Sequence, residues 1–377
     1  MLPGFLDSII KEGAQRLLQQ ALEAEMANFL SGWSKELTDQ GKQAVVRNGH
    51  YSRSILSPVG QLDLNMPRSL DRNDKGRKWS SSILPPYMRR TPCLENLIPA
   101  LYLKGVSIGN MTEALKAILG PEVNISPAVI NDLKEQWIKE YHEWSERDLS
   151  GLSFDYVWVD AVYFNCKAEE NLRYCLLVMI AADPAGKKHL LSIKQGFKES
   201  ALSWSEMIVD LISRGLRDCP KMVIGDGALG IWKAVEENWS ESLQQRCWIH
   251  KARNVLDKLP KSLFKEADLD LKKIYMAKDR PTGEGNLREF YNKYSKRYPA
   301  ACEVLKKDED LLFNYYNFPA GHWTTIRNTN VIESAFSTVR LRTSTTRGIG
   351  TSENILAMTF KLLQNGESHW KRLVARE

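Results

Sequence analysis

Residues 223–254, VIGDGALGIWKAVEENWSESLQQRCWIHKARN, organise the chain. They begin within a short apolar run, 222–224, which predicts a buried strand. The run ends at Gly225, Asp226 and Gly227. Because glycine lets backbone approach a ligand closely, an acid between two glycines at a strand end is a candidate ligand-contacting group. Asp226 is therefore the first candidate site residue.

The rest of this stretch predicts a helix and a second strand. Apolar residues recur at helical spacing over 231–239. A strand is expected over 245–249, carrying Cys247 with His250 directly after it. A strand, an acid, a helix and a strand in this order form an α/β unit.

The composition is that of an ordinary globular protein. The chain has 377 residues, 43% of them hydrophobic and 26% charged, which is enough for two or three domains. It has no apolar run long enough for a transmembrane helix and no signal-peptide pattern at its start. Six cysteines without regular spacing suit free thiols in a reducing cytoplasm. We expect neither a membrane protein nor a disulfide scaffold.

Positive charge is concentrated in one segment. The chain has a net charge of +6, and residues 47–90 hold nine Lys or Arg residues against three acids. Such local excess is expected of a module that contacts nucleic-acid phosphates, although a solvated basic loop has the same composition. The candidate phosphate-contacting residues here are Arg47, Arg53 and Arg68.

The N-terminal part is predicted to combine helices with a small hairpin. Apolar residues at three- and four-residue steps predict a helix over 5–30, whose apolar face packs either on its own domain or on a second protomer. The hairpin is expected over 54–66. Short helices next to a basic segment resemble a helix-turn-helix DNA reader, but other three-helix bundles share the pattern. These helices are expected over 94–105, 108–118 and 127–146.

From residue 153 the sequence is rich in strands. The order of elements resembles a ribonuclease-H-like core, in which three antiparallel strands precede alternating helices and parallel strands. A helical segment over about 256–323 interrupts that core. The fold class is therefore α+β with a mixed sheet. Besides the opening stretch, we expect strands over 156–164, 171–182 and 189–195, and helices over 202–216, 329–341 and 353–363.

Two acids are expected to lie on neighbouring strands. Asp160 is in the middle of the first strand, on the face of Trp158 and Val162, where an unpaired carboxylate is unfavourable or shifts its pKa. Asp226 ends the strand that lies beside it in such a sheet. Two carboxylates at neighbouring strand ends can bind a divalent metal ion. A hydrogen-bonded structural Asp is the alternative for Asp160.

Glu333 is the third candidate acid. It lies near the start of the helix 329–341 and shares a face with Ser337 and Arg340. Asn330, three residues earlier, makes a capping box an equally good explanation.

Cys247 and His250 suggest a zinc site, but a structural zinc needs four ligands. No second Cys/His pair lies at suitable spacing. We expect these two residues to have a structural or orienting role, with metal contact as the alternative.

Together these motifs resemble the Mutator-type transposases of bacterial insertion sequences. They are Asp160 in VDAVYF, Asp226 in GDGALGIWKAV, the pair Cys247 and His250, and Glu333 in NTNVIESAFSTVRLRTSTTRG. No single motif is specific, but their order and spacing are. The likeness continues through GHYSRSILSPVGQLDLNMPR and covers nearly the whole chain.

The resemblance implies a DDE transposase. Asp160, Asp226 and Glu333 would hold two Mg²⁺ or Mn²⁺ ions, which activate water or a 3′-hydroxyl and stabilise the leaving oxygen. The partners would be double-stranded DNA, as terminal inverted repeats and target, and a second copy in a homodimer. The location would be the bacterial cytoplasm, at the nucleoid. Phosphates near the cleaved end would be contacted by Arg340, Arg342 and Arg347.

Three regions follow from this assignment. They are an N-terminal helical segment, 1–46, a DNA-binding region, 47–150, and a ribonuclease-H-like catalytic domain, 151–377, with its helical insertion. A non-catalytic DNA-binding descendant remains an alternative, which the intact acids disfavour. A ribonuclease-H-like nuclease without strand transfer is another, and it would not need the basic segment.

Overall fold

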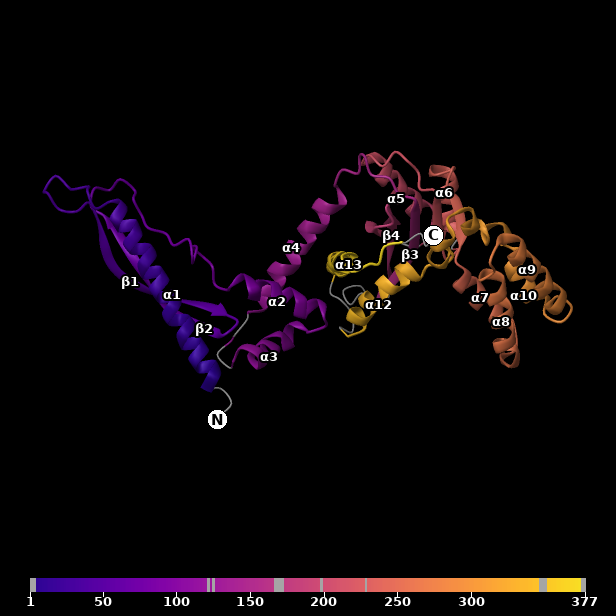
Figure 1. Cartoon of the computed structure of the whole chain (residues 1–377), viewed down its shortest axis with the longest axis horizontal. Helices are drawn as coiled ribbons and strands as arrows, with labels where there is room; N and C mark the ends of the chain where they lie inside the picture. Colours follow the sequence, from indigo (N-terminus) through magenta and orange to yellow (C-terminus); the bar gives the residue numbers. More distant parts are fainter. Residues whose placement is uncertain are drawn as a thin grey trace. The chain divides into compact units, whose positions relative to one another are not determined.

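The computed structural model describes residues 5–120, 123, 126–165, 173–196, 199–227, 229–345 and 351–373 (Figure 1). The chain divides into two compact units, Met1–Leu133 and Lys134–Glu377, and the division falls inside helix α4 (Pro127–Ser145). Strands and helices both occur and the larger sheet is mixed, so the expected α+β class is confirmed.

The first unit packs a long helix on a two-stranded antiparallel sheet. Strands β1 (Val45–Ser57) and β2 (Gly60–Asp71) extend the expected hairpin at both ends. Helix α1 (Phe5–Gly32) buries Leu22 and Met26 against the apolar face of this sheet. The helix 5–30 thus packs at least partly on its own domain.

Two shorter helices follow in this unit, α2 (Pro92–Leu103) and α3 (Ile108–Leu119). Ser107 caps α3, since its hydroxyl accepts a hydrogen bond from the N–H of Asn110 at 3.2 Å.

The second unit is built on a five-stranded sheet in the order β5-β4-β3-β6-β7. The pairs β3–β4 and β4–β5 are antiparallel, whereas β3–β6 and β6–β7 are parallel. Consecutive residues of β3 are buried on both faces, as its apolar sequence predicts for a central strand. The strands are β3 (Tyr156–Asn165), β4 (Arg173–Ala182), β5 (Lys188–Gly196), β6 (Met222–Gly225) and β7 (Leu243–Arg246).

Helices cover both faces of this sheet (Figure 1). On one face, α5 (Ala201–Ser213) and α6 (Leu229–Asn238) form a continuous core with alternate residues of β3, β4 and β6. On the other, α12 (Asn330–Thr345) packs against β3 and β4, and α13 (Ser352–Glu367) against β5.

The chain between β7 and α12 is helical, as expected. Its helices are α7 (Trp248–Leu256), α8 (Phe264–Tyr275), α9 (Arg280–Tyr294), α10 (Pro299–Lys306) and α11 (Trp323–Ile326). Short 3₁₀ turns lie at Lys261–Leu263, Glu309–Leu311, Asn314–Asn317 and Ala320–His322.

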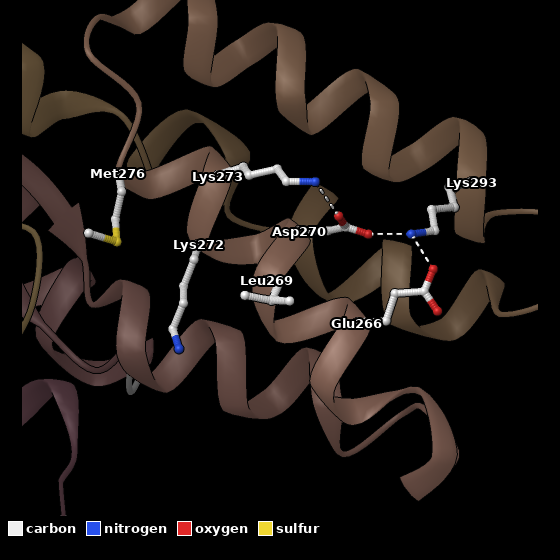
Figure 2. Close-up of a pocket in the computed structure, with 7 residues that line it drawn as sticks. All are labelled: Glu266, Leu269, Asp270, Lys272, Lys273, Met276 and Lys293. Carbon is white, nitrogen blue, oxygen red and sulfur yellow. Dashed lines mark hydrogen bonds and ion pairs between the residues drawn. The ribbon is translucent and has the colours of Figure 1, made fainter.

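Ion pairs join α8 to α9 in this helical segment. Lys293 of α9 lies 2.6 Å from Glu266 and 2.5 Å from Asp270 of α8, and within α8 Lys273 lies 2.9 Å from Asp270. These residues line an open pocket, shown in Figure 2, that includes none of the predicted site residues.

The expected strand 245–249 is wrong at its end. Strand β7 stops at Arg246, Cys247 is the N-cap of α7, and His250 lies in the first turn of that helix. Trp248 explains the difference. Its backbone N–H donates to the carbonyl of Arg327 at 3.0 Å, and its indole N–H donates to the carbonyl of Leu312 at 2.6 Å.

Two further expectations concern the whole chain. None of the helices that the structure describes is both long and apolar enough to span a bilayer. The described cysteines Cys93, Cys175, Cys219, Cys247 and Cys302 are free thiols, while Cys166 lies outside the described residues.

Candidate functional site

Asp160 lies on β3, and Asp226 directly follows the end of the adjacent parallel strand β6. Trp158 of β3 pairs with Ile224 of β6, and each acid comes two residues after its member of that pair. Because side chains alternate along a strand, Asp160 lies on the face of Trp158. The charge of Asp226 acts on the Asp160 carboxyl. The structure therefore brings the first two predicted acids together at the carboxyl end of β6.

Asp160 is partly buried in an unfavourable electrostatic environment. One carboxylate oxygen accepts the N–H of Ala161 at 2.8 Å. Burial and the negative charges of Asp226 and Glu199 raise the pKa of Asp160 to about 7, against the effects of that hydrogen bond and of His250. Ionisation of Asp160 therefore lowers the free energy of unfolding of the metal-free protein, and a bound cation would offset this loss.

The turn after β6 requires glycine at Gly227. Its φ is +92°, and a Cβ there would lie 0.7 Å from Nη1 of Arg246. The same arginine lies with its Nε 3.2 Å from Asp308, which also pairs with Lys251. A buried arginine therefore lies directly against the backbone next to Asp226.

Cys247 and His250 lie where α7 begins beside β6. The N–H of Cys247 donates to the carbonyl of Gly225 at 2.8 Å. Burial opposes ionisation of the Cys247 thiol, but hydrogen bonds with His250 and Thr329 outweigh it and lower its pKa. The hydrogen bond with Cys247 and nearby negative charges raise the pKa of His250, against burial. Both shifts are therefore in the direction of the charged form, the thiolate of Cys247 and the imidazolium of His250.

Glu333 lies in the first turn of α12, but not in a capping box with Asn330. The helix is preceded by Thr329, whose carbonyl accepts the N–H groups of Ile332 and Glu333 at 3.0 Å each. The N–H of Asn330 donates to Oδ1 of Asn328 at 2.9 Å. The Glu333 carboxylate accepts the Thr329 hydroxyl at 2.7 Å instead. The capping-box explanation of Glu333 is therefore wrong.

Cys247, His250 and Glu333 converge on one point. One potential metal-ligand atom from each residue lies within 4.8 Å of those of the other two. Among the described residues, this is the group of three or more His, Cys, Asp or Glu side chains that meets this criterion. His250 Nδ1 lies 3.8 Å from Glu333 Oε1. The cluster joins the start of α7 to the start of α12.

The three predicted acids are linked through His250. The charge of His250 acts on Asp160, and the charges of Asp226 and Glu333 act on His250. Within the described residues, Asp160, Asp226 and Glu333 do not themselves form a group with all ligand atoms within 4.8 Å. His250 therefore lies within electrostatic reach of all three acids.

Glu199 was not singled out by the sequence. It is hydrogen-bonded to Tyr163 of β3. Burial, helped by the charge of Asp226, raises the pKa of Glu199 against the effect of that hydrogen bond, and burial also raises the pKa of Tyr163. No motif marks Glu199, since it lies just before the N-cap of α5 without a recognisable pattern.

The predicted arginines of the second unit have different surroundings. Arg340 is exposed on α12, with its guanidinium 5.7 Å from the ring centre of Phe336. Arg342 is only 2% exposed, so its side chain is not at the surface of this structure. Arg347 lies outside the described residues.

The predicted arginines of the first unit also differ. Arg47 pairs with Glu23 on α1. Arg53 donates to the carbonyls of Leu84, Pro85 and Met88 at 3.0, 2.7 and 2.6 Å, so it fixes the segment after the hairpin. Arg68 is exposed.

A groove of about 680 Å³ lies beside Arg68. The guanidinium of Arg68 stacks on Tyr51, 4.8 Å from the ring centre. Lys78 lies on the same groove, and none of the described residues that line it is acidic. Tyr87, which also lines it, is 96% exposed with a φ of +67°.

The comparisons with known proteins cover nearly the whole chain. A family model described as "Transposase, Mutator family" matches residues 4–373. The transposase of insertion sequence element IS6120 from Mycolicibacterium smegmatis is 39% identical over 282 residues, 75% of this chain and 87% of the relative. The transposase of IST2 from Acidithiobacillus ferrooxidans is 41% identical over 268 residues, 71% of this chain and 90% of the relative. The transposase of ISRM5 from Rhizobium meliloti is 26% identical over 363 residues, 96% of this chain and 88% of the relative. This chain therefore belongs to the Mutator family of transposases.

Proposed function

We propose that the protein is a DDE transposase that binds the terminal inverted repeats of its insertion sequence and catalyses metal-dependent strand cleavage and strand transfer. The observation that carries this proposal is the pair Asp160, on β3, and Asp226, directly after the adjacent strand β6, with the pKa of Asp160 raised to about 7 by burial and by the charge of Asp226. Two partly buried acids kept close together are unfavourable for folding and useful for binding a cation.

The sheet supports a ribonuclease-H-like catalytic core. Three antiparallel strands are followed along the chain by two parallel ones, and β6 lies beside β3, as such a core would have it. The helices α7–α11 lie between β7 and α12, as an insertion before the third acid would. We propose three regions: an N-terminal helical segment, 1–46, a DNA-binding region, 47–150, and a catalytic domain, 151–377.

The donor set of the pair suits Mg²⁺ or Mn²⁺. Carboxylate oxygens are the ligands that these ions prefer, and the protein provides no full compensation for the charge of Asp160. Asp160 and Asp226 would hold two such ions, with Glu333 as the third ligand. When bound, the ions would supply activation of water or a 3′-hydroxyl and stabilisation of the leaving oxygen.

The chain's own residues orient this site. The N–H of Ala161 fixes one carboxylate oxygen of Asp160. The glycine at Gly227 lets the turn that carries Asp226 lie against Arg246. Glu333 lies in the first turn of α12, far along the chain from Asp160 and Asp226. We still predict no stoichiometric zinc at Cys247 and His250; metal analysis of chelator-free protein that finds one zinc per chain would contradict this.

The groove beside Arg68 supports DNA binding by the first unit. Arg47 is paired with Glu23, and Arg53 donates hydrogen bonds to backbone carbonyls. Arg53 lines the groove together with Arg68 and Lys78, and none of the described lining residues is acidic. The backbone of Tyr87 lies in the left-handed region, a conformation that costs about 1–3 kcal/mol. Its side chain is 96% exposed, so burial of the ring does not offset this cost, which suits a role in binding. We propose that this groove contacts phosphates of the terminal repeat.

We also propose that the protein acts as a homodimer. The N-terminal half of α1 leaves a row of large apolar side chains exposed, and exposed apolar patches mark interaction sites. These side chains are Phe5, Leu6, Ile9, Ile10 and Leu17.

The test uses the purified full-length protein and a duplex that carries an inverted repeat found beside the gene. With Mg²⁺, we expect strand cleavage at the repeat and joining of the released 3′ end to a target duplex. A non-catalytic DNA-binding descendant would bind the same duplex without cutting it at any Mg²⁺ or Mn²⁺ concentration. A nuclease would cut it without joining the ends.

A further inference from the structure

Thr329 occupies the centre of the cluster formed by Cys247, His250 and Glu333. It is fully buried at the start of α12. Its Oγ1 lies 3.2 Å from Cys247 Sγ, 3.3 Å from His250 Nδ1 and 2.7 Å from Glu333 Oε1. Its backbone N–H donates to Cys247 Sγ at 3.3 Å. One residue thus contacts every member of the cluster.

The chemistry of a hydroxyl group sets the direction of these hydrogen bonds. A hydroxyl has one hydrogen and two lone pairs, so Oγ1 can donate to only one neighbour. The shortest contact is with Glu333, whose carboxylate is an acceptor only. His250 can then donate its Nδ1–H to Oγ1, and Cys247 Sγ accepts the backbone N–H of Thr329. Cys247 and His250 are also hydrogen-bonded to each other, so each of the four groups has a partner.

The cluster is also tied to the strand that carries Asp226. The N–H of Cys247 donates to the carbonyl of Gly225, the residue before Asp226, at 2.8 Å. The carbonyl of Thr329 accepts the N–H of Glu333 at 3.0 Å. A continuous series of hydrogen bonds therefore runs from the end of β6 through Cys247 and Thr329 to Glu333.

We propose that Thr329 is a positioning residue that sets the carboxylate of Glu333 relative to Asp226, with Cys247 and His250 as its fixed support. This inference rests on the proposed function, in which Glu333 is the third acid. It assigns the Cys247 and His250 pair a role in holding that acid rather than half of a zinc site.

The test compares Thr329→Val with Thr329→Ser. Valine keeps the shape and the backbone N–H but removes the hydroxyl, whereas serine keeps the hydroxyl. Thr359→Val is the matched control. Thr359 is also fully buried, but on α13, and its hydroxyl has no hydrogen-bond partner among the described residues.

Two measurements separate positioning from simple stability. The first is the melting temperature of the DNA-free protein as a function of Mg²⁺ concentration. Thr329→Val should melt within a few degrees of wild type in chelator and need about 10-fold more Mg²⁺ for half of its metal-induced stabilisation. The second is the cleavage assay, in which kcat should fall about 10- to 100-fold with KM for DNA unchanged. Thr329→Ser and Thr359→Val should match wild type within about threefold in both.

Several results would overturn the inference. One is wild-type Mg²⁺ dependence and kcat in Thr329→Val, and another is a loss in Thr329→Ser as large as in Thr329→Val. If Thr329→Val does not fold, Cys247→Ala decides in the same assays, because it removes the support of Thr329. A wild-type Mg²⁺ response in Cys247→Ala contradicts the inference. Glu333→Gln separates this failure from failure of the proposed function, since an active Glu333→Gln would remove Glu333 itself from the site.

Discussion

At the scale of single residues, the site is built from charges that the fold alone does not favour. Asp160 has a pKa raised to about 7 by burial and by Asp226 and Glu199. The folded state therefore binds the Asp160 proton more tightly than the unfolded state, whose carboxyl titrates near 3.8. Ionised Asp160 thus lowers the free energy of unfolding above its folded pKa and has no effect below the unfolded pKa. The loss is at most about 1.4 kcal/mol for each pH unit that separates the two pKa values.

This linkage predicts that Asp160→Asn melts higher than wild type in chelator at pH 8. The difference should shrink as the pH falls below 7 and vanish well below pH 3.8, where wild-type Asp160 is protonated in both states. Mg²⁺ should reverse the order at pH 8, because it stabilises only the protein that keeps the carboxylate. Thermal melts across pH, with and without Mg²⁺, check this. Equal melting temperatures of the two proteins at pH 8 in chelator would show that the ionised Asp160 carboxylate does not destabilise the folded protein.

Gly227 gives a second prediction at this scale. Ala at this position combines a left-handed φ of +92° with a Cβ 0.7 Å from Arg246 Nη1. We expect Gly227→Ala to lower the free energy of unfolding by about 1–3 kcal/mol, measured by urea unfolding. The control is Gly285→Ala in α9, where the nearest atom is 4.0 Å away and Ala should stabilise the helix by about 1 kcal/mol or less. Equal effects of the two substitutions would contradict the close approach of Arg246.

At the scale of elements, the sequence predicted which segments form strands and helices better than it predicted where they end. The apolar runs of β3 and β6 were enough to predict that Asp160 and Asp226 lie on or directly after neighbouring strands, because the pattern of a strand is local. The end of β7 depends on Trp248, which bonds to Arg327 and Leu312 far along the chain. Local patterns carry no information about such contacts. Thr329 and Glu199 escaped notice for the same reason.

The β1–β2 hairpin carries a prediction about DNA binding. Arg68→Gln and Lys78→Gln should each weaken binding of the full chain to duplex DNA and reduce the slope of log K against log salt by about 1. Both residues line the groove beside β2. Fluorescence anisotropy over a salt series measures the slope.

Arg47→Gln is the matched control on the same hairpin, because Arg47 is already paired with Glu23. It should leave the slope of log K unchanged. A loss of slope in Arg47→Gln equal to that in Arg68→Gln, or unchanged slopes in both groove variants, would show that DNA binds elsewhere.

At the scale of the whole molecule, the two compact units suit a division between DNA recognition and chemistry. The sequence suggests such a division, because the excess positive charge falls within 47–90 and the three candidate acids fall after residue 153. Composition could not show that Arg47 and Arg53 make contacts within the first unit. Arg47 pairs with Glu23 of α1, which is distant in sequence, and Arg53 donates to backbone carbonyls.

The exposed half of α1 predicts that the chain self-associates. The double variant Leu6→Glu and Leu17→Glu should convert a dimer to a monomer, because both side chains are 68% exposed on this helix. Light scattering coupled to gel filtration gives the mass. Leu269→Glu, at a residue 60% exposed on α8, is the control and should stay dimeric. A monomeric wild type, or a dimeric double variant, would contradict this interface.

The central claim is that Asp160 and Asp226 form the catalytic metal site of a transposase. It is tested most directly by cleavage and strand transfer of an inverted-repeat duplex with Mg²⁺, comparing wild type with Asp160→Asn and Asp226→Asn. Each substitution keeps the side-chain shape but removes a charge that would hold the ions. We predict that both variants bind the duplex as wild type does and neither cuts nor joins it. Turnover near that of wild type in either variant would contradict the account.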